Sequence, residues 1–164
     1  MNTLDPFEVY DGSQYRARFF DGLKLFRNSD YAAALVIFRE ITAVVDGRDV
    51  YRNKYLSYEG LTRVCLGEKR ALALCREAAA DEIKDVDVHY AHALAEFKVN
   101  NRRLAVAAVK RGLAIDSGNQ ELLRLRAIMG MRRDPLIRFL DRDHFLNKWL
   151  GKLTYKKPPI SGKS

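Results

Sequence analysis

The sequence predicts an all-α fold in which a helix hairpin recurs about three times. Three stretches, 21–38, 59–75 and 92–109, follow one pattern. Each begins with a small residue followed by leucine, has an apolar residue three positions later, and continues through a short polar break into an alanine-rich segment. Ala34, Ala71 and Ala105 occupy the same place in that segment at intervals of roughly 34–37 residues, a period typical of stacked helical repeats. The period-two alternation of a strand does not persist anywhere.

Capping and turn residues predict where the helices begin and end. Ser13 and Asp30 are placed to cap the first two helices, and Gly67 is placed to end the third. The remaining boundaries follow from turn residues in the same way. We expect the second helix to stop at Asp46-Gly47, the fourth to span about 68–81, the fifth about 86–99, the sixth to end near 116–118 and the seventh near Gly130.

Charge is distributed unevenly along the chain. The 164 residues carry a net charge of +8, and nine Lys and Arg against three Asp lie from position 132 onward. The basicity therefore belongs mainly to the end of the chain. We expect an N-terminal extension at 1–12, a helical repeat domain at 13–131, an amphipathic basic capping segment at 132–157 and a disordered tail at 158–164.

The sequence also predicts a cytoplasmic protein. The first twelve residues lack the basic start and apolar core of a secretory signal, and no apolar run approaches the roughly 20 residues of a membrane span. The two cysteines, Cys65 and Cys75, lie within helical patterns. We expect both to be buried thiols in a reducing compartment rather than a disulfide.

The segment 132–157 combines apolar residues at helical spacing with many cations. We expect it to cover the open end of the helical array, because such an array exposes apolar surface at its last repeat. A dock for another protein and a strip that contacts phosphate are the alternatives. The residues expected to act in this segment are Arg132, Arg133, Arg138, Arg142, Lys148 and Trp149.

The repeated pattern resembles the tetratricopeptide repeat, over about 13–119. The turn "NSDY" (28–31), Ala34 and Phe38 match its first unit, and "GLAIDSGN" (112–119) matches the end of the third, with Ser117 where that family usually has proline. The second unit departs from the pattern, since its turn "LGEK" is one residue shorter. The ending "FLDRDHFLNKWLGK" is similar to that of small bacterial members. The resemblance implies a right-handed superhelix of about three hairpins with capping helices, and protein binding in its concave groove.

An apolar stripe recurs on the first helix of each unit. Asp21, Glu59 and His92 stand where the family has a bulky apolar residue. The apolar positions lie instead at Phe19-Leu23-Phe26, Ser57-Leu61-Val64 and Tyr90-Leu94-Phe97, each set on one helix face. The stripe is either ordinary core between helices or the floor of the groove. An apolar floor would need an occupant, a partner's helix or the chain's own end, because burial of each large side chain contributes about 1.5–3 kcal/mol.

Motifs for catalysis are absent from the sequence. It has no glycine-rich phosphate loop and no Ser-His-Asp order, and the pair His89 and His92 lacks the further ligands of a metal site. We therefore expect no enzymatic activity, no cofactor and no metal.

The expected function is that of an adaptor or scaffold that binds a helix or peptide of another protein in the groove. Aromatic residues would supply buried area, and cations would orient an acidic ligand. The residues expected to contact the partner are Phe19, Leu23, Phe26, Arg27, Lys54, Leu61, Tyr90, Leu94, Phe97 and Lys98.

Other functions stay open at this point. A binder of nucleic acid, ribosome or anionic membrane would use the basic end together with Arg102, Arg103, Lys110 and Arg111 of the sixth helix. A secretion-type chaperone is a further alternative, as is a homo-oligomer.

Overall fold

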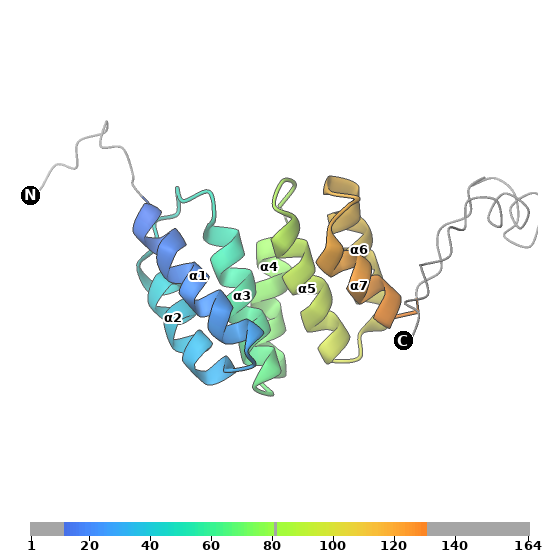
Figure 1. Cartoon of the computed structure of the whole chain (residues 1–164), viewed down its shortest axis with the longest axis horizontal. Helices are drawn as coiled ribbons and strands as arrows, with labels where there is room; N and C mark the ends of the chain where they lie inside the picture. The colour runs from blue at the N-terminus through green and yellow to red at the C-terminus, as the bar shows by residue number, and fades with distance from the viewer. Residues whose placement is uncertain (1–11, 81, 131–164) are drawn as a thin grey trace, which may run out of the picture. The chain divides into compact units, whose positions relative to one another are not determined.

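The computed structural model describes residues 12–80 and 82–130. This part of the chain is all-helical and contains no strand, which confirms the predicted fold class (Figure 1). One short 3₁₀ turn, Lys69–Ala71, precedes the fourth α-helix. The α-helices are α1 (Ser13–Arg27), α2 (Tyr31–Val44), α3 (Arg52–Cys65), α4 (Leu72–Ala80), α5 (Val86–Lys98), α6 (Arg102–Ile115) and α7 (Gln120–Ile128).

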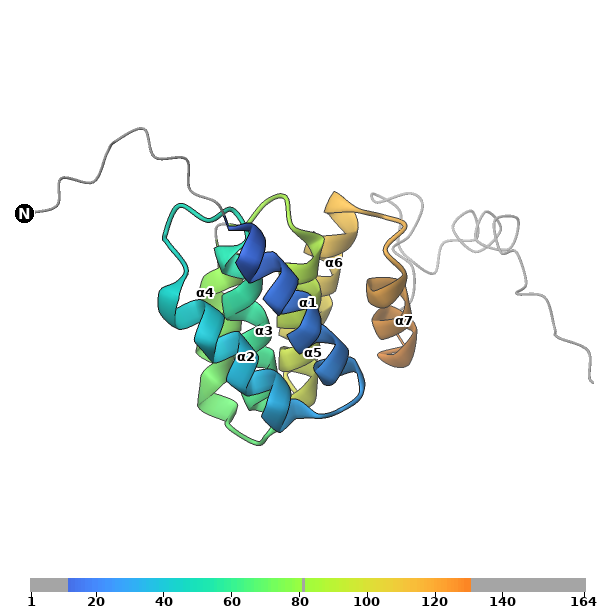
Figure 2. The ribbon, with the colours of Figure 1, turned by 60° about the vertical axis from the view of Figure 1, so that its left-hand side comes forward.

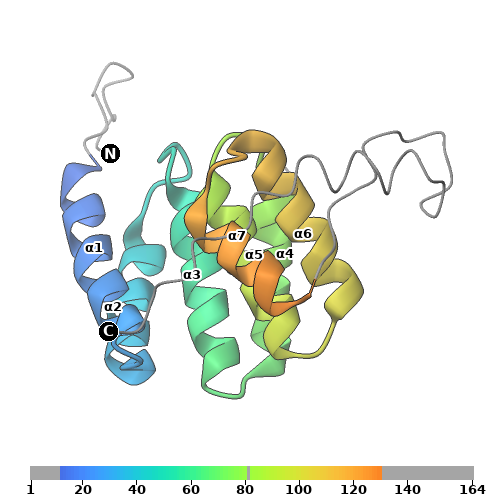
Figure 3. The ribbon, with the colours of Figure 1, turned by 45° about the vertical axis from the view of Figure 1, so that its right-hand side comes forward.

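The helices pack as successive hairpins. Helix α1 packs on α2, α3 on α4, and α5 on α6, and each hairpin contacts the next through α2 with α3 and through α3 and α4 with α5. Figure 2 shows α1 beside α2, and Figure 3 shows α7 lying against α5. This order of contacts is compatible with a superhelix of repeats.

The three hairpins share one type of turn. After α1, the Ser29 N–H donates to the Phe26 carbonyl and the Asp30 N–H donates to the Leu25 carbonyl, both at 3.0 Å. The same two bonds follow α3 and α5, and together they form a Schellman motif. This motif requires one residue in the left-handed region, where it has a positive φ: Ser29 (64°), Gly67 (96°) and Asn100 (65°).

The predicted helix ends agree with the structure in most places and fail in two. Asp30 caps α2 as expected, and its side chain accepts a hydrogen bond from the Ala33 N–H at 3.2 Å. Ser13 was expected to cap α1, but it is the first helical residue, and Gly12 precedes it without a side-chain cap. The α-helical part of the fourth helix begins at Leu72 instead of near 68. Glu68 supplies no side-chain cap, and the chain enters α4 through 3₁₀ bonds.

Small residues allow the paired helices to approach closely. A Cβ atom at Gly22 would lie 2.7 Å from Cε1 of Phe38 on α2. At Gly60 it would lie 2.9 Å from Sγ of Cys75 and 3.0 Å from the Ala71 carbonyl oxygen. Such distances are shorter than van der Waals contact. The small residue that recurs in the sequence therefore marks the contact between the two helices of a hairpin.

Aromatic rings join the first two hairpins. The Phe19 ring lies 5.4 Å from Phe38, 5.3 Å from Tyr55 and 5.3 Å from Tyr58, measured between centroids. These four residues come from α1, α2 and α3 and are almost completely buried. The cluster fixes α1 against α3, and it therefore also fixes the surface that these two helices form together.

Both cysteines are free thiols, and only Cys75 is fully buried, whereas Cys65 is half-buried. Burial, together with the nearby charge of Glu96, raises the pKa of Cys75 to about 12. None of the helices in the described part combines the length and the apolar character needed to cross a bilayer.

Several predictions fall outside the described residues. These are the N-terminal extension apart from Gly12, the tail at 158–164 and the capping segment at 132–157. The expected capping residues Arg132, Arg133, Arg138, Arg142, Lys148 and Trp149 belong to that segment.

Candidate functional site

A pocket lies where the first helices of the hairpins converge. Its volume is about 270 Å³. Helices α1, α3, α5 and α7 contribute to its walls, together with the turn after α1 and the start of α2. The lining residues are Leu23, Phe26, Arg27, Ser29, Tyr31, Tyr58, Asp87, Tyr90 and Glu121.

The pocket brings together part of the predicted partner surface. Leu23, Phe26, Arg27 and Tyr90 all line it. Phe19 and Leu61 lie in the core, with 4% and 0% of their surface exposed, and so offer no area to a partner. Leu94 and Phe97 are half-buried, and Lys98 is exposed beyond the pocket lining. The apolar stripe thus divides between its two interpretations: Phe19, Ser57, Leu61 and Val64 are core, while Leu23, Phe26, Tyr90, Leu94 and Phe97 are half-buried.

Five lining residues were missed from the sequence: Ser29, Tyr31, Tyr58, Asp87 and Glu121. Helical spacing offered a signal for two of them. Tyr58 follows Lys54 by four positions, and Tyr90 follows Asp87 by three, so each pair shares a helix face. Glu121 gave no such signal, because it lies on α7, outside the repeated pattern.

Two tyrosines of the pocket, Tyr58 and Tyr90, are neutral hydrogen-bonding groups. Burial, the charge of Glu121 and a side-chain hydrogen bond with Glu121 raise the pKa of Tyr90 to about 12. Burial and the nearby Asp87 also raise the pKa of Tyr58 well above its ordinary value. The Tyr58 side chain is only 5% exposed, and among the described residues its hydroxyl has no hydrogen-bond partner. Tyr58 lines the pocket, so its hydroxyl is available to a ligand.

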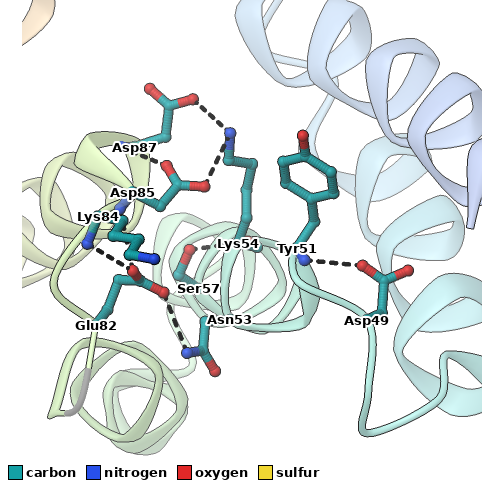
Figure 4. A network of polar contacts seen from close by, with 9 residues as sticks. All are labelled: Asp49, Tyr51, Asn53, Lys54, Ser57, Glu82, Lys84, Asp85 and Asp87. Atoms are coloured by element: carbon teal, nitrogen blue, oxygen red, sulfur yellow. Dashed lines mark hydrogen bonds and ion pairs between the residues drawn. The ribbon is translucent and has the colours of Figure 1, made fainter.

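Lys54, expected to contact a partner, is held within the fold. Its Nζ lies 3.0 Å from Oδ2 of Asp85 and 3.0 Å from Oδ2 of Asp87, and 5.4 Å from the centre of the Tyr51 ring (Figure 4). Burial alone would lower the pKa of Lys54, but the two carboxylates outweigh it and raise the pKa above its ordinary value. The lysine therefore links the start of α3 to the start of α5.

A second contact strengthens the same link. Asn53 Nδ2 donates to Oε2 of Glu82 at 3.2 Å, and Oε1 of Glu82 accepts hydrogen bonds from the N–H groups of Lys84 and Asp85 (Figure 4). Asp85 in turn caps α5 by accepting from the Asp87 N–H at 3.0 Å. These bonds hold Asp87 and Tyr90 at the pocket, because they fix the first turn of α5.

No protein-family model and no curated protein matches this chain. The pocket and the charges around it are the features on which a function can be argued.

A buried polar network links α5 to α4 and to the turn before α6. Glu96 has no exposed surface, and its carboxylate accepts from Arg76 at 2.8 and 3.2 Å, from Asn101 at 2.8 Å and from His92 at 3.2 Å. Burial would raise the pKa of Glu96, but these hydrogen bonds outweigh it and lower the pKa. Burial lowers the pKa of His92 below 6.5 despite the neighbouring Glu96.

His89 also has a partner within the fold, because its Nε2 contacts the Glu82 carbonyl at 3.0 Å. Within 12–80 and 82–130, no three His, Cys, Asp or Glu side chains gather in a way that could hold a metal ion. The contacts of His89 and His92 place both histidines in the scaffold.

Basic residues are exposed along α6. Arg102 and Arg103 lie in its first turn, and Lys110 and Arg111 lie in its second half. Cations in the first turn are disfavoured by the partial positive charge of a helix N-terminus. This surface is separate from the pocket, which has no lining residue from α6.

Proposed function

We propose that this protein is a non-enzymatic adaptor, of the tetratricopeptide type, that binds a helix or an extended peptide of another protein. The binding face is the one formed by α1, α3, α5 and α7. The observation that carries this proposal is the pocket to which all four helices contribute apolar, aromatic and charged side chains. Its volume of about 270 Å³ lies just below the roughly 300–1,000 Å³ of small-molecule sites, and it suits an anchoring side chain of a partner.

The chemistry of the lining supports binding rather than catalysis. Leu23 and Phe26 are half-buried, and covering such side chains contributes up to about 1.5–3 kcal/mol each. Tyr90, with its pKa raised to about 12, stays a neutral phenol at pH 7. It suits hydrogen bonding to a partner and is a poor group for proton transfer near neutral pH.

Affinity capture with a charge reversal tests this proposal. Glu121→Lys changes an exposed residue of the pocket, and Glu77→Lys makes the same change on α4, away from it. The full-length protein and both variants are used to capture proteins from cell extract, which are quantified by mass spectrometry. We expect a partner that the wild type and Glu77→Lys retain and that Glu121→Lys loses. If every captured protein is retained equally by all three, the pocket is not the binding face.

The basic row on α6 favours a second candidate function, binding to a polyanion such as nucleic acid, ribosome or anionic membrane. Contacts between cations and phosphates weaken steeply with salt, because bound counterions are released. Gel-shift and liposome-flotation assays at two salt concentrations test this function. Replacing Arg102, Arg103 and Arg111 by serine should reduce binding at low salt. Binding that survives these changes and high salt would contradict it.

A further inference from the structure

We propose that the pocket receives the side chain of an arginine or a lysine from the partner's peptide. This inference rests on the proposed function and reverses the acidic ligand that the sequence predicts. Two carboxylates, Asp87 and Glu121, line the pocket with three tyrosines, whereas Arg27 is the one cation among the described lining residues. The net charge of the lining is therefore negative.

Of the two carboxylates that line the pocket, Asp87 has a cation partner and Glu121 does not. Asp87 and Asp85 share Lys54, and Asp21 pairs with Lys24. Among the described residues, Glu121 makes no ion pair, and it lies close enough to Tyr90 to raise the pKa of that phenol. Lys54 Nζ lies 3.0 Å from Oδ2 of Asp87, and the Asp87 side chain is still 45% exposed. Glu121 and the partly exposed Asp87 are thus the two carboxylates that an incoming cation can reach.

The aromatic lining suits the rest of a basic side chain. Phe26 lies 5.3 Å from Tyr31 and 5.9 Å from Tyr58, between ring centroids, and the three rings form one wall. The aliphatic stem of lysine or arginine packs well on such a surface while its charged head reaches a polar edge. Ring faces also attract cations. The Tyr58 hydroxyl, without a partner in the described part of the chain, can accept from the ammonium or guanidinium group.

Among the cations from which the sequence predicts an acidic ligand, Arg27 alone is a described lining residue of the pocket. Lys54 is held by Asp85 and Asp87, and Lys98 does not line the pocket. Arg27 remains, exposed at the end of α1. The carboxylates come from α5 and α7, so the bound cation lies on the side of these two helices.

Capped single amino acids test the charge preference directly. Acetyl-arginine amide, acetyl-lysine amide and acetyl-glutamate amide are titrated into the ¹⁵N-labelled full-length protein, and amide shifts are followed by NMR. We expect saturable shifts at Arg27, Tyr90 and Glu121 with the two basic probes and none with the glutamate probe. Glu121→Gln should weaken binding of the basic probes by about three- to tenfold, as loss of one charged contact does.

Two further variants give the sign of the effect. Arg27→Gln should strengthen binding of the basic probes, because it removes a repelling charge, and Glu77→Gln on α4 should leave it unchanged. Preferential binding of acetyl-glutamate amide that Arg27→Gln abolishes would overturn the proposal in favour of an acidic ligand. The absence of saturable shifts with every probe would also overturn it, even if Glu121→Lys still loses a captured partner and the proposed function stands.

The chain's own basic end is the alternative occupant. A full-length variant in which the nine Lys and Arg residues from position 132 onward are replaced by serine tests this case. If the basic probes bind this variant and not the wild type, the occupant is the protein's own segment, and the assignment to a partner is wrong. Equal binding to both proteins supports the partner.

Discussion

Lys54→Met keeps most of the aliphatic length of the side chain and removes the charge that bridges Asp85 and Asp87. Removing one partner of a fully buried ion pair costs about 3–5 kcal/mol, whereas an exposed pair contributes at most about 1 kcal/mol. Lys54 lies between these limits, because its side chain is 17% exposed and its Nζ lies 3.0 Å from each of two carboxylates. We expect the free energy of unfolding to fall by about 2 kcal/mol.

Urea unfolding followed by circular dichroism measures this change at pH 7. Lys24→Met is the matched control, since its pair with Asp21 is exposed on both sides, and we expect a change within about 0.5 kcal/mol. The pKa of Lys54 is raised on folding, so its contribution is fully present below the ordinary lysine value and is lost only as the pH rises through the higher, folded value. The deficit of Lys54→Met should therefore be equal at pH 7 and pH 9.

A double-mutant cycle separates the bridge from other effects of the substitution. Asp87→Asn combined with Lys54→Met should show a coupling energy of about 1 kcal/mol. Stability equal to that of Lys24→Met, together with weaker partner capture, would refute the reasoning. Lys54 would then be a partner contact, as the sequence predicts, and the bridge would carry little energy.

Three further predictions concern the scaffold. Gly60→Ala should lower the free energy of unfolding by about 1–2 kcal/mol in urea titrations, because the contacts of the added methyl group with α4 outweigh the roughly 1 kcal/mol gained in helix propensity. Gly47→Ala, with open space around it, should change the stability little, and equal stability of the two variants would contradict the prediction. Cys75 should resist iodoacetamide at pH 8 until the protein unfolds, as measured by mass spectrometry, since burial raises its pKa to about 12; rapid native alkylation would show that the site opens. Stability should fall as the pH drops from 7 to 5, because His92 takes up a proton at a higher pH in the unfolded state than in the folded state. His92→Gln should reduce this dependence of the free energy of unfolding on pH, and an unchanged dependence would assign it to other groups.

Features that depend on local sequence were predicted well. The all-α fold and most helix ends follow from periodicity and from turn residues such as Asp30 and Gly67, which act within a few positions of the chain. The predicted start of α4 was wrong. The choice between an α-helix and a 3₁₀ turn there depends on whether the residue at 68 caps the helix, and a glutamate gives no clear signal of whether it will do so.

Features that depend on contacts between hairpins were predicted poorly. Lys54 looked like a free cation in the sequence, since its carboxylates lie 31 and 33 positions away at Asp85 and Asp87. The pocket was found only in part for the same reason. Tyr58 and Glu121 do not occupy matching positions of the repeat, so a pattern that compares one unit with the next passes over them.

The turns between paired helices couple the two helix ends that they join. The residue whose N–H closes the first helix is also the residue that precedes the first turn of the second, as with Asp30 between α1 and α2. The end of α1 uses the N–H of Asp30, and the start of α2 uses its carbonyl and carboxylate oxygens, so displacement of this one residue loosens both ends. The two ends should therefore open together, and amide protons at the end of α1 and at the start of α2 should exchange with solvent at similar rates.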